Sequence, residues 1–368
     1  MSDSTLDRAP QAAAKLALMR RWLHDTGAGA LRLRGIDWFA WCTAGGSSAV
    51  LQACETGVAE VLVTKAEACI LTDETVADRL REEEVPPGFS FHVTPWEDLA
   101  WRERFVLESA FGAPVLSDRP RGAELALPAS VHHQRLVLSE PEQQRYRQLG
   151  GQAAEAISEA LRAARPDWTE YELAAAGARA LWRRGIHPAL VLAVGSARLA
   201  LYREPTPSAA RLGERAMLVL RGRRHGLHAC LTRFVSFGSA GPASALQADL
   251  LTVEATALAA CVPGNSLAAV YHALLQAYRH VGRPEAMREH TQGGVTAYLT
   301  HELMATASTA LALEPGMALA FNPGFAGIQI EDTFLLGERG LENLTCDPSW
   351  PATTVQGRNR PLWLEAAC

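Results

Sequence analysis

The stretch LEPGMALAFNPGFAGIQIEDT, residues 313–333, contains two apolar segments separated by an Asn-Pro-Gly break and a further glycine. Proline and glycine interrupt regular structure, and the apolar segments on either side are short, so we expect two strands joined by a turn. The second strand ends in an adjacent acidic pair, Glu331 and Asp332. This segment is therefore the candidate centre of the C-terminal part of the chain.

The chain upstream of this segment predicts helices followed by strands. Ser139 with Glu142, and Thr169 with Glu172, have the spacing of capping boxes, which mark the starts of two helices. Further elements are expected in the order strands 189–195, 216–221 and 227–237, helices 243–261 and 267–281, and strands near 294 and at 317–321 and 328–336. Helices followed by an antiparallel sheet are typical of an α+β architecture.

The first part of the chain alternates strands with helices. Strands are expected at 30–33, 60–64, 68–72 and 89–93, and helices at 11–25, near 47–57, at 75–84 and at 99–111. This alternation indicates an α/β domain. Residues 128–138 are interpreted as a connection, so we expect two domains, 1–135 and 136–368.

Composition narrows the class of protein. The 368 residues are 48% hydrophobic and 20% charged, which is typical of a globular protein. A formal net charge of -5 gives no electrostatic reason to expect nucleic acid or an anionic membrane as a partner. No secretory start and no apolar run of bilayer length are visible, so a cytoplasmic protein is expected.

The cysteines are scattered and have no Cys-x-x-Cys spacing. An odd, dispersed set indicates free, buried thiols that pack as small apolar groups, with Cys230 the one of functional interest. The set comprises Cys42, Cys54, Cys69, Cys230, Cys261, Cys346 and Cys368.

Four motifs occur in an order that resembles the pita-bread metallopeptidases, which include aminopeptidase P, prolidase, methionine aminopeptidase and creatinase. They are the segment 226–238 with its Thr232-Arg233 pair, the segment 292–294, the segment 315–317 and the segment 331–333. The first 135 residues resemble the creatinase-type N-terminal domain. The resemblance implies an α/β N-terminal domain, an α+β pita-bread C-terminal domain and a homodimer.

The same resemblance implies where metal ligands would lie. Active members hold two metal ions with two aspartates, one histidine and two glutamates, and the metals activate a water. The corresponding positions in this chain are Val219 (Leu220 or Arg221 if the register shifts), Cys230, Thr291 (His290 if it shifts), Asn322 and Glu331. One carboxylate remains, so we expect no dinuclear site and no metal cofactor. A single metal on Cys230, His228 and His290 is an alternative, against which a buried thiol beside a hydrogen-bonded histidine is favoured.

Creatinase offers a metal-free precedent within this fold, in which histidine and glutamate side chains hydrolyse a guanidino C–N bond. Its histidine base corresponds to a loop where this chain has Tyr202 and Glu204. A different acid–base set is therefore proposed, comprising His290, His301, Glu302, Glu331 and His228. The candidate substrate-binding residues are Arg203, Tyr202, Tyr298 and Asn322.

Each of these assignments has a structural alternative. Glu302 can be an ordinary ion-paired residue, and Arg203 and Arg198 can form exposed ion pairs. Thr232 and Arg233 are expected to support the sheet.

Three hypotheses about function follow. The first is a metal-independent hydrolase or lyase that acts on a small amino-acid-derived amide or guanidino compound. The second is a non-catalytic pseudopeptidase that binds a peptide or small ligand. The third is a metal-dependent Xaa-Pro aminopeptidase or dipeptidase with atypical ligands. All three imply a small-molecule or short-peptide partner, and none implies nucleic acid or membrane.

Overall fold

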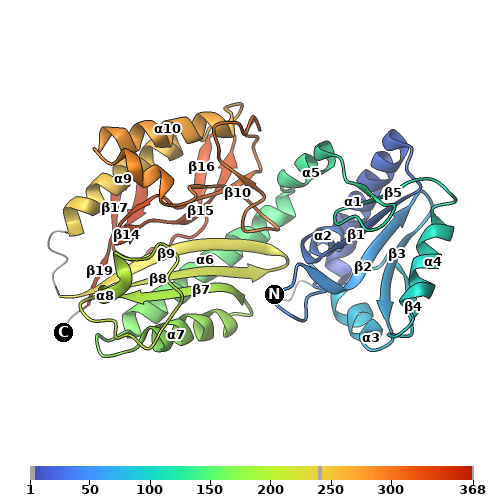
Figure 1. The fold of residues 1–368 in the computed structure, drawn as a ribbon, viewed down its shortest axis with the longest axis horizontal. Helices are drawn as coiled ribbons and strands as arrows, with labels where there is room; N and C mark the ends of the chain where they lie inside the picture. The colour runs from blue at the N-terminus through green and yellow to red at the C-terminus, as the bar shows by residue number, and fades with distance from the viewer. Residues whose placement is uncertain (1–4, 239–242, 367–368) are drawn as a thin grey trace. The chain divides into compact units, whose positions relative to one another are not determined.

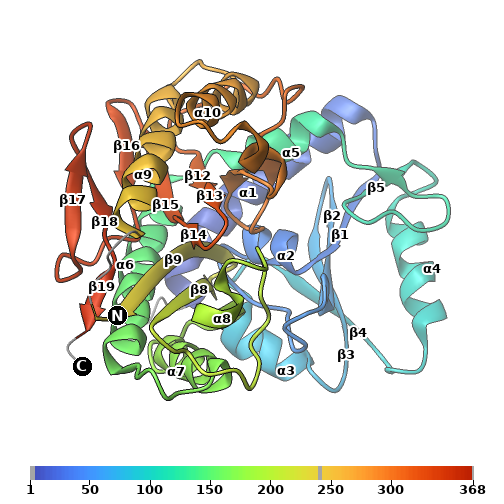
Figure 2. The same ribbon diagram turned by 60° about the vertical axis from the view of Figure 1, so that its left-hand side comes forward.

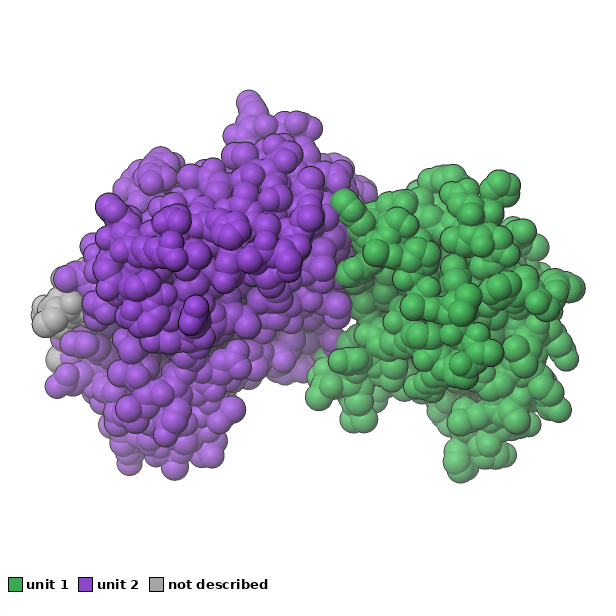
Figure 3. Space-filling model, turned by 45° about the horizontal axis from the view of Figure 1, so that its top comes forward, with its two compact units in different colours: residues 1–135, 225–227 green, residues 136–224, 228–368 purple. Residues whose placement is uncertain are grey.

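The computed structural model describes residues 5–238 and 243–366. Cys368, one of the expected free thiols, lies outside the described residues. The chain forms two compact units, shown in different colours in Figure 3. Unit 1 comprises residues 1–135 with 225–227, and unit 2 comprises residues 136–224 with 228–368.

Unit 1 contains a six-stranded mixed sheet in the order β4-β3-β2-β1-β5-β6 (Figure 1). Strand β1 is antiparallel to β2 and parallel to β5, and β3 is parallel to β4. The strands are β1 Ala30–Gly35, β2 Thr56–Thr64, β3 Ala68–Asp73, β4 Ser90–Thr94, β5 Val115–Ser117 and β6 Leu125–Ala126. The helices are α1 Thr5–Thr26, α2 Ile36–Cys42, α3 Ala77–Arg79 with a π-helical turn Leu80–Glu84, α4 Leu99–Ser109 and α5 Ala129–Leu136.

Two predictions for unit 1 are wrong. The helix expected near 47–57 is a loop, and the short helix α2 precedes it at 36–42. Gly45 adopts a φ of 114°, which only glycine tolerates easily, and Gly46 follows it, so the chain leaves α2 for a loop. The expected connection 128–138 contains α5, whose Arg135 donates to the Asp37 carboxylate of α2 at 2.6 Å.

Unit 2 contains two larger sheets. One has the order β19-β9-β8-β7 and the other has the order β11-β10-β12-β15-β16. A single antiparallel bridge between Thr232 and Glu331 joins them. The strands are β7 His187–Gly195, β8 Arg215–Arg224, β9 Leu227–Phe237, β10 Gly293–Thr296, β11 Leu303–Met304, β12 Ala318–Phe321, β13 Gly324–Phe325, β14 Ile328–Gln329, β15 Asp332–Gly337, β16 Gly340–Asn343, β17 Ala352–Val355, β18 Arg358–Pro361 and β19 Leu364–Ala366.

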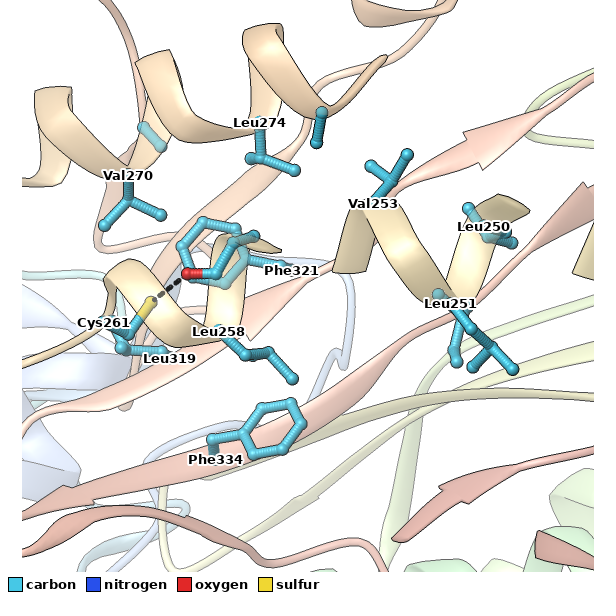
Figure 4. Packing of buried hydrophobic residues seen from close by; sticks show 14 of the residues in the cluster. Leu250, Leu251, Val253, Leu258, Cys261, Val270, Leu274, Leu319, Phe321 and Phe334 are labelled. Atoms are coloured by element: carbon cyan, nitrogen blue, oxygen red, sulfur yellow. Dashed lines mark hydrogen bonds between the residues drawn. The ribbon is translucent and has the colours of Figure 1, made fainter. Parts of the chain in front are cut away.

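Helices cover both sides of these strands (Figures 1 and 2). Helices α6 (Glu140–Ala163) and α7 (Glu170–Trp182) pack on β7 and β8, and both begin at the predicted capping boxes. Helices α9 (Ala243–Ala260) and α10 (Leu267–His280) lie on the other side, and α8 (Ser196–Leu199) follows β7. Figure 4 shows Leu258 of α9 and Leu274 of α10 around the core rings of Phe321 and Phe334.

The segment 313–333 differs from the two expected strands in one respect. The predicted strand 328–336 is interrupted, because β14 ends at Gln329 and β15 begins at Asp332. Strands β13 and β14 form a small hairpin whose turn contains Gly327 at a φ of 84°. Glu331 lies in the interruption, where its backbone pairs with Thr232 instead of continuing the ladder.

The thiol prediction needs a correction. Cys42, Cys69, Cys230 and Cys261 are free and buried, as expected, but Cys54 and Cys346 are free and exposed. Both exposed cysteines lie in irregular segments, where no sheet or helix covers the side chain.

Residues 5–238 and 243–366 include no helix that is both long and apolar enough to cross a membrane.

Candidate functional site

Glu331 lies at the point where the two sheets of unit 2 meet. Its backbone carbonyl accepts from the Thr232 amide at 3.1 Å, and its Oε2 accepts from the Thr232 hydroxyl at 3.1 Å. Gln329 in turn donates to that hydroxyl at 3.0 Å. Glu331 is only 2% exposed, and this burial raises the pKa of its carboxyl group, with Arg221 acting in the opposite direction.

Arg221 forms an ion pair with the Glu331 carboxylate. It lies on β8, and its Nη2 is 4.0 Å from Oε1 of Glu331. Burial works against its charge, but Glu331 and Cys230 leave the pKa of the guanidinium above its usual value. Arg221 therefore stays charged at neutral pH.

Strand geometry explains why Arg221 reaches this place. Alternate residues of a strand share a face, so Arg221 projects from the same face of β8 as Val219. Val219 is 2% exposed and packs in the hydrophobic core of unit 2. Arg221 therefore lies on the same face of β8 as the core residue Val219, two residues further along the strand.

Cys230 and His228 share one face of β9 and are both buried. Burial, with Glu331, raises the pKa of the Cys230 thiol to about 12, so it is protonated at neutral pH. Burial, with Arg223, lowers the pKa of His228 to about 4, so its ring is neutral. The backbone amide of His228 donates to the Ala297 carbonyl at 2.9 Å, while its Nδ1 has no hydrogen-bond partner among the described residues.

Asn322 lies across from Glu331. Phe321 of β12 pairs with Asp332 of β15 in antiparallel register, so the next residues along each strand face each other. The Asn322 side chain is 3% exposed, and within the described chain its Oδ1 has no hydrogen-bond partner. Its backbone amide donates to the Gln292 carbonyl at 3.2 Å.

His290 and His301 contribute imidazoles near this cluster. His290 Nε2 is 3.8 Å from a Glu204 carboxylate oxygen, whereas the neighbouring Thr291 is exposed. Burial and then Arg221 lower the pKa of His301 to about 4, so its ring is neutral. Glu204 and His290 act on the same ring, which places both close to it.

Glu302 and Tyr298, two predicted site residues, form hydrogen bonds that hold the local fold. Glu302 is 7% exposed, and its carboxylate accepts the backbone amides of Tyr298 at 3.0 Å and Leu299 at 3.1 Å. The Tyr298 hydroxyl donates to Glu142 of α6 at 2.5 Å. These contacts hold the turn between β10 and β11.

Arg203 and Tyr202, the predicted substrate-binding residues on the loop after α8, also have contacts within the protein. Arg203 donates to the Phe325 carbonyl and to the Glu289 carboxylate. Tyr202 is 52% exposed, and the Arg198 guanidinium lies 5.3 Å from the centre of its ring. Arg198 itself donates to the buried Glu170 and does not form an exposed pair.

A second buried charge cluster supports the strands behind the site. Asp332 accepts from Arg233 at 2.7 Å, from Thr345 at 2.7 Å and from Arg360 at 2.7 Å. Burial tends to raise the pKa of Asp332, but Arg233 and Arg360 hold it below its usual value. Arg360 also pairs with Glu254 of α9. These contacts agree with the expected supporting role of Arg233.

The structure therefore brings together Glu331, Asn322, Cys230, His290 and His301. The residue that sequence reasoning missed is Arg221, which was considered only as an alternative position for a lost metal ligand. The available signal was the period of two in a strand, because it places residue 221 beside residue 219 on one face.

The comparisons with known proteins agree with this architecture. The chain matches the model of metallopeptidase family M24 over residues 144–338. Its structure is similar to a Xaa-Pro dipeptidase from Bacillus anthracis, with 17% identity, a TM-score of 0.78, and coverage of 96% of this chain and 99% of that chain.

Two further solved structures are similar. A prolidase from Pyrococcus horikoshii OT3 has 19% identity, a TM-score of 0.77, and coverage of 90% of this chain and 98% of that chain. An X-Pro aminopeptidase from Thermotoga maritima MSB8 has 18% identity, a TM-score of 0.72, and coverage of 88% and 96% respectively. No curated protein sequence matches this chain.

At these identities the solved structures show the fold. They confirm the predicted N-terminal α/β sheet domain followed by a C-terminal pita-bread domain. The family model covers more than half of the chain and includes β8, β9, β10, β12 and the whole segment 313–333 that carries Glu331. The chain therefore belongs to metallopeptidase family M24.

Proposed function

We propose that this M24 protein hydrolyses a C–N bond of a small amino-acid-derived amide or guanidino compound without a metal ion. The observation that carries the proposal is the buried pair of Arg221 and Glu331 with His290 and His301 beside it. Removing a cation and a carboxyl group from water costs desolvation free energy. Titratable groups in such environments cluster at functional sites.

The chemistry of the donor set argues against a two-metal site. Of the five positions that the family resemblance assigns to ligands, only Glu331 carries a carboxylate, while Val219, Thr291 and Asn322 supply no anion. The Arg221 guanidinium, 4.0 Å from Glu331, would repel a divalent cation there. Among the residues that the structure describes, no three or more His, Cys, Asp or Glu side chains are grouped so as to hold a metal.

The remaining groups suit acid–base catalysis. Burial raises the pKa of Glu331, and in this proposal its carboxyl group is the acid that donates a proton to the departing nitrogen. His290, next to Glu204, is the candidate base that takes a proton from the attacking water. Water adds to the carbon, the C–N bond breaks, and the nitrogen leaves protonated. His301 is neutral and offers a hydrogen bond to the reacting group.

Turnover by purified protein tests this proposal. N-acylated amino acids and guanidino acids would be incubated with the full chain and the released amine quantified. We expect Glu331→Gln and His290→Ala each to lower the rate by about 100-fold or more, since each removes a proton-transfer group. The exposed Glu338→Gln and His272→Ala serve as matched controls and should retain the wild-type rate. Unchanged rates in both site variants would refute the assignment.

A second candidate function is ligand binding without turnover. It is favoured by the contacts of Glu302, Tyr298 and Arg203, which are committed to holding loops and leave few free groups for chemistry. In this case a ligand should raise the thermal midpoint and be recovered unchanged. Recovery of a cleavage product would exclude this candidate.

A further inference from the structure

Arg221 is a largely shielded cation whose Nε–H has no hydrogen-bond partner among the described residues. Its side chain is 13% exposed, and it makes no hydrogen bond within the described chain. The Nε–H is shielded from solvent and has no partner there, and the nearest carboxylate oxygen, on Glu331, is 4.0 Å from Nη2. That distance is too long for a hydrogen bond.

Two other buried arginines of unit 2 are bonded differently. Arg233 donates to the Thr232 and Thr345 carbonyls at 2.8 Å and to Asp332 at 2.7 Å. Arg360 donates to Glu254 through Nε at 2.6 Å and to Asp332 at 2.7 Å. The Nε–H of a guanidinium is a hydrogen-bond donor, and burying it without an acceptor is unfavourable. The acceptor that Arg221 lacks is therefore expected to come from a bound molecule.

The charges around Arg221 favour an anion. The Cys230 thiol is protonated and the His301 ring is neutral. Neither group therefore adds a negative or a positive charge beside the Arg221 guanidinium. The two acidic neighbours are Glu331, whose protonated form burial favours, and Glu204, whose side chain is 70% exposed. A planar carboxylate fits a guanidinium in a two-point, charge-assisted contact.

Asn322 supplies a second, independent indication of a ligand. Its side chain is 3% exposed, and its Oδ1 is a buried acceptor that lacks a donor within the described residues. It lies across from Glu331 at the end of the β12–β15 ladder, so it belongs to the same site. An N–H group of a ligand would satisfy this acceptor, just as a carboxylate would satisfy Arg221.

We infer that Arg221 is the anion-binding residue of the site, and that the ligand carries a carboxylate together with an N–H group held by Asn322. The inference rests on the site described under the proposed function, but it concerns which molecule binds and not whether it is cleaved. N-acyl amino acids and guanidino acids have both groups. Arg203, whose donors are occupied by Phe325 and Glu289, is not required for this contact.

Calorimetric titration with two matched probes tests the inference. N-acetylglycine carries the carboxylate, and N-acetylglycinamide replaces it with a neutral amide of nearly the same shape. We expect wild-type protein to bind the acid at least about tenfold more tightly than the amide, because only the acid forms the charge-assisted contact. Arg221→Gln should abolish this preference, and Arg221→Lys should retain part of it because a point charge remains.

Arg215→Gln is the control for the loss of one positive charge. Arg215 lies at the opposite end of β8, against the Trp363 ring, and projects from the same face as Arg221. This variant should keep the wild-type preference for the acid. Circular dichroism spectra that match the wild-type spectrum would show that each variant is folded.

Three results would overturn the inference. They are equal binding of both probes by wild-type protein, an undiminished preference for the acid in Arg221→Gln, and no binding of N-acetylglycine below about 10 mM. Tighter binding of inorganic phosphate than of the acid would also refute a carboxylate-specific contact. Preference for the acid that depends on Arg221, without any cleavage of it, would leave the inference standing and count against the hydrolase.

Discussion

At the scale of single residues, Arg221 and Arg233 show that two arginines in the same unit can differ in how their guanidinium groups are bonded. Arg233 is 4% exposed and joins β9 to Asp332 and to the Thr345 carbonyl, so its charge is compensated. Arg221 is shielded almost as well, but the described residues leave it without a hydrogen-bond acceptor. The first arginine stabilises the fold through its hydrogen bonds, and the second contributes none.

Replacing each arginine by methionine should therefore change stability by different amounts. We expect Arg233→Met to lower the free energy of unfolding by about 3–5 kcal/mol, because Asp332 loses a buried partner. Arg221→Met should lower it by no more than about 1 kcal/mol, because the pairing lost with Glu331 spans 4.0 Å and includes no hydrogen bond. Urea denaturation of both variants measures the effect. Equal losses in the two variants would mean that Arg221 is bonded as firmly as Arg233.

At the scale of the elements, the close packing of strand β10 against β12 positions the backbone around Asn322. It lies between β11 and β12, and Gly293 adopts a φ of 92° at its start. A Cβ placed on Gly293 would lie 2.1 Å from the Ala320 carbonyl oxygen of β12, which no adjustment of a side chain could relieve. The close approach of the two backbones keeps Gln292 next to Asn322.

Gly293→Ala should lower the free energy of unfolding by more than about 2 kcal/mol, because the strands must separate to admit a methyl group. Gly282→Ala is a matched control, since Gly282 also has a positive φ of 73° but has open space around the position of a Cβ. That control should cost only about 1–2 kcal/mol, the price of the backbone conformation. Equal losses in the two variants would show that the backbone conformation, and not the close strand approach, determines the effect.

At the scale of the whole molecule, the fold of unit 2 is held together by apolar packing. The core of unit 2 is formed by the inner faces of α9 and α10 and by strands such as β12 and β15 (Figure 4). This packing depends on apolar volume and not on the identity of Val219, Asn322 or Cys230 as ligands. A chain can therefore keep the M24 fold and carry different chemistry in it.

Metal content separates the proposed function from a metallopeptidase with atypical ligands. After incubation with manganese, cobalt or zinc and removal of free metal, we expect well under one tightly held equivalent per chain by elemental analysis. Treatment with a chelator should leave the thermal midpoint unchanged, because no folding free energy comes from metal binding. Two retained equivalents of metal, lost together with stability on chelation, would instead support the third hypothesis.

The order and type of most elements could be predicted from the sequence because they depend on local signals. The capping boxes at Ser139 and Thr169 start α6 and α7 as predicted, and the strand expected at 227–237 matches β9. Local signals failed at residues 47–57, where a helix was expected, and at 128–138, where α5 was missed. The interruption between β14 and β15 was also missed, since it results from pairing with the distant Thr232.

What the sequence by itself determined is the family fold, because it depends on residue identity and order. The shortage of carboxylates at the positions that the resemblance assigns to metal ligands stays a prediction. Only the tertiary structure decided which of the remaining polar side chains have partners. Glu302, Tyr298 and Arg203 are committed to local contacts, while Arg221 and Asn322 are buried with unused hydrogen-bonding groups. Hydrogen bonding and burial depend on groups brought together from distant parts of the chain, so these differences become visible only when the sheet that contains β8 meets the sheet that contains β12 and β15 at Glu331.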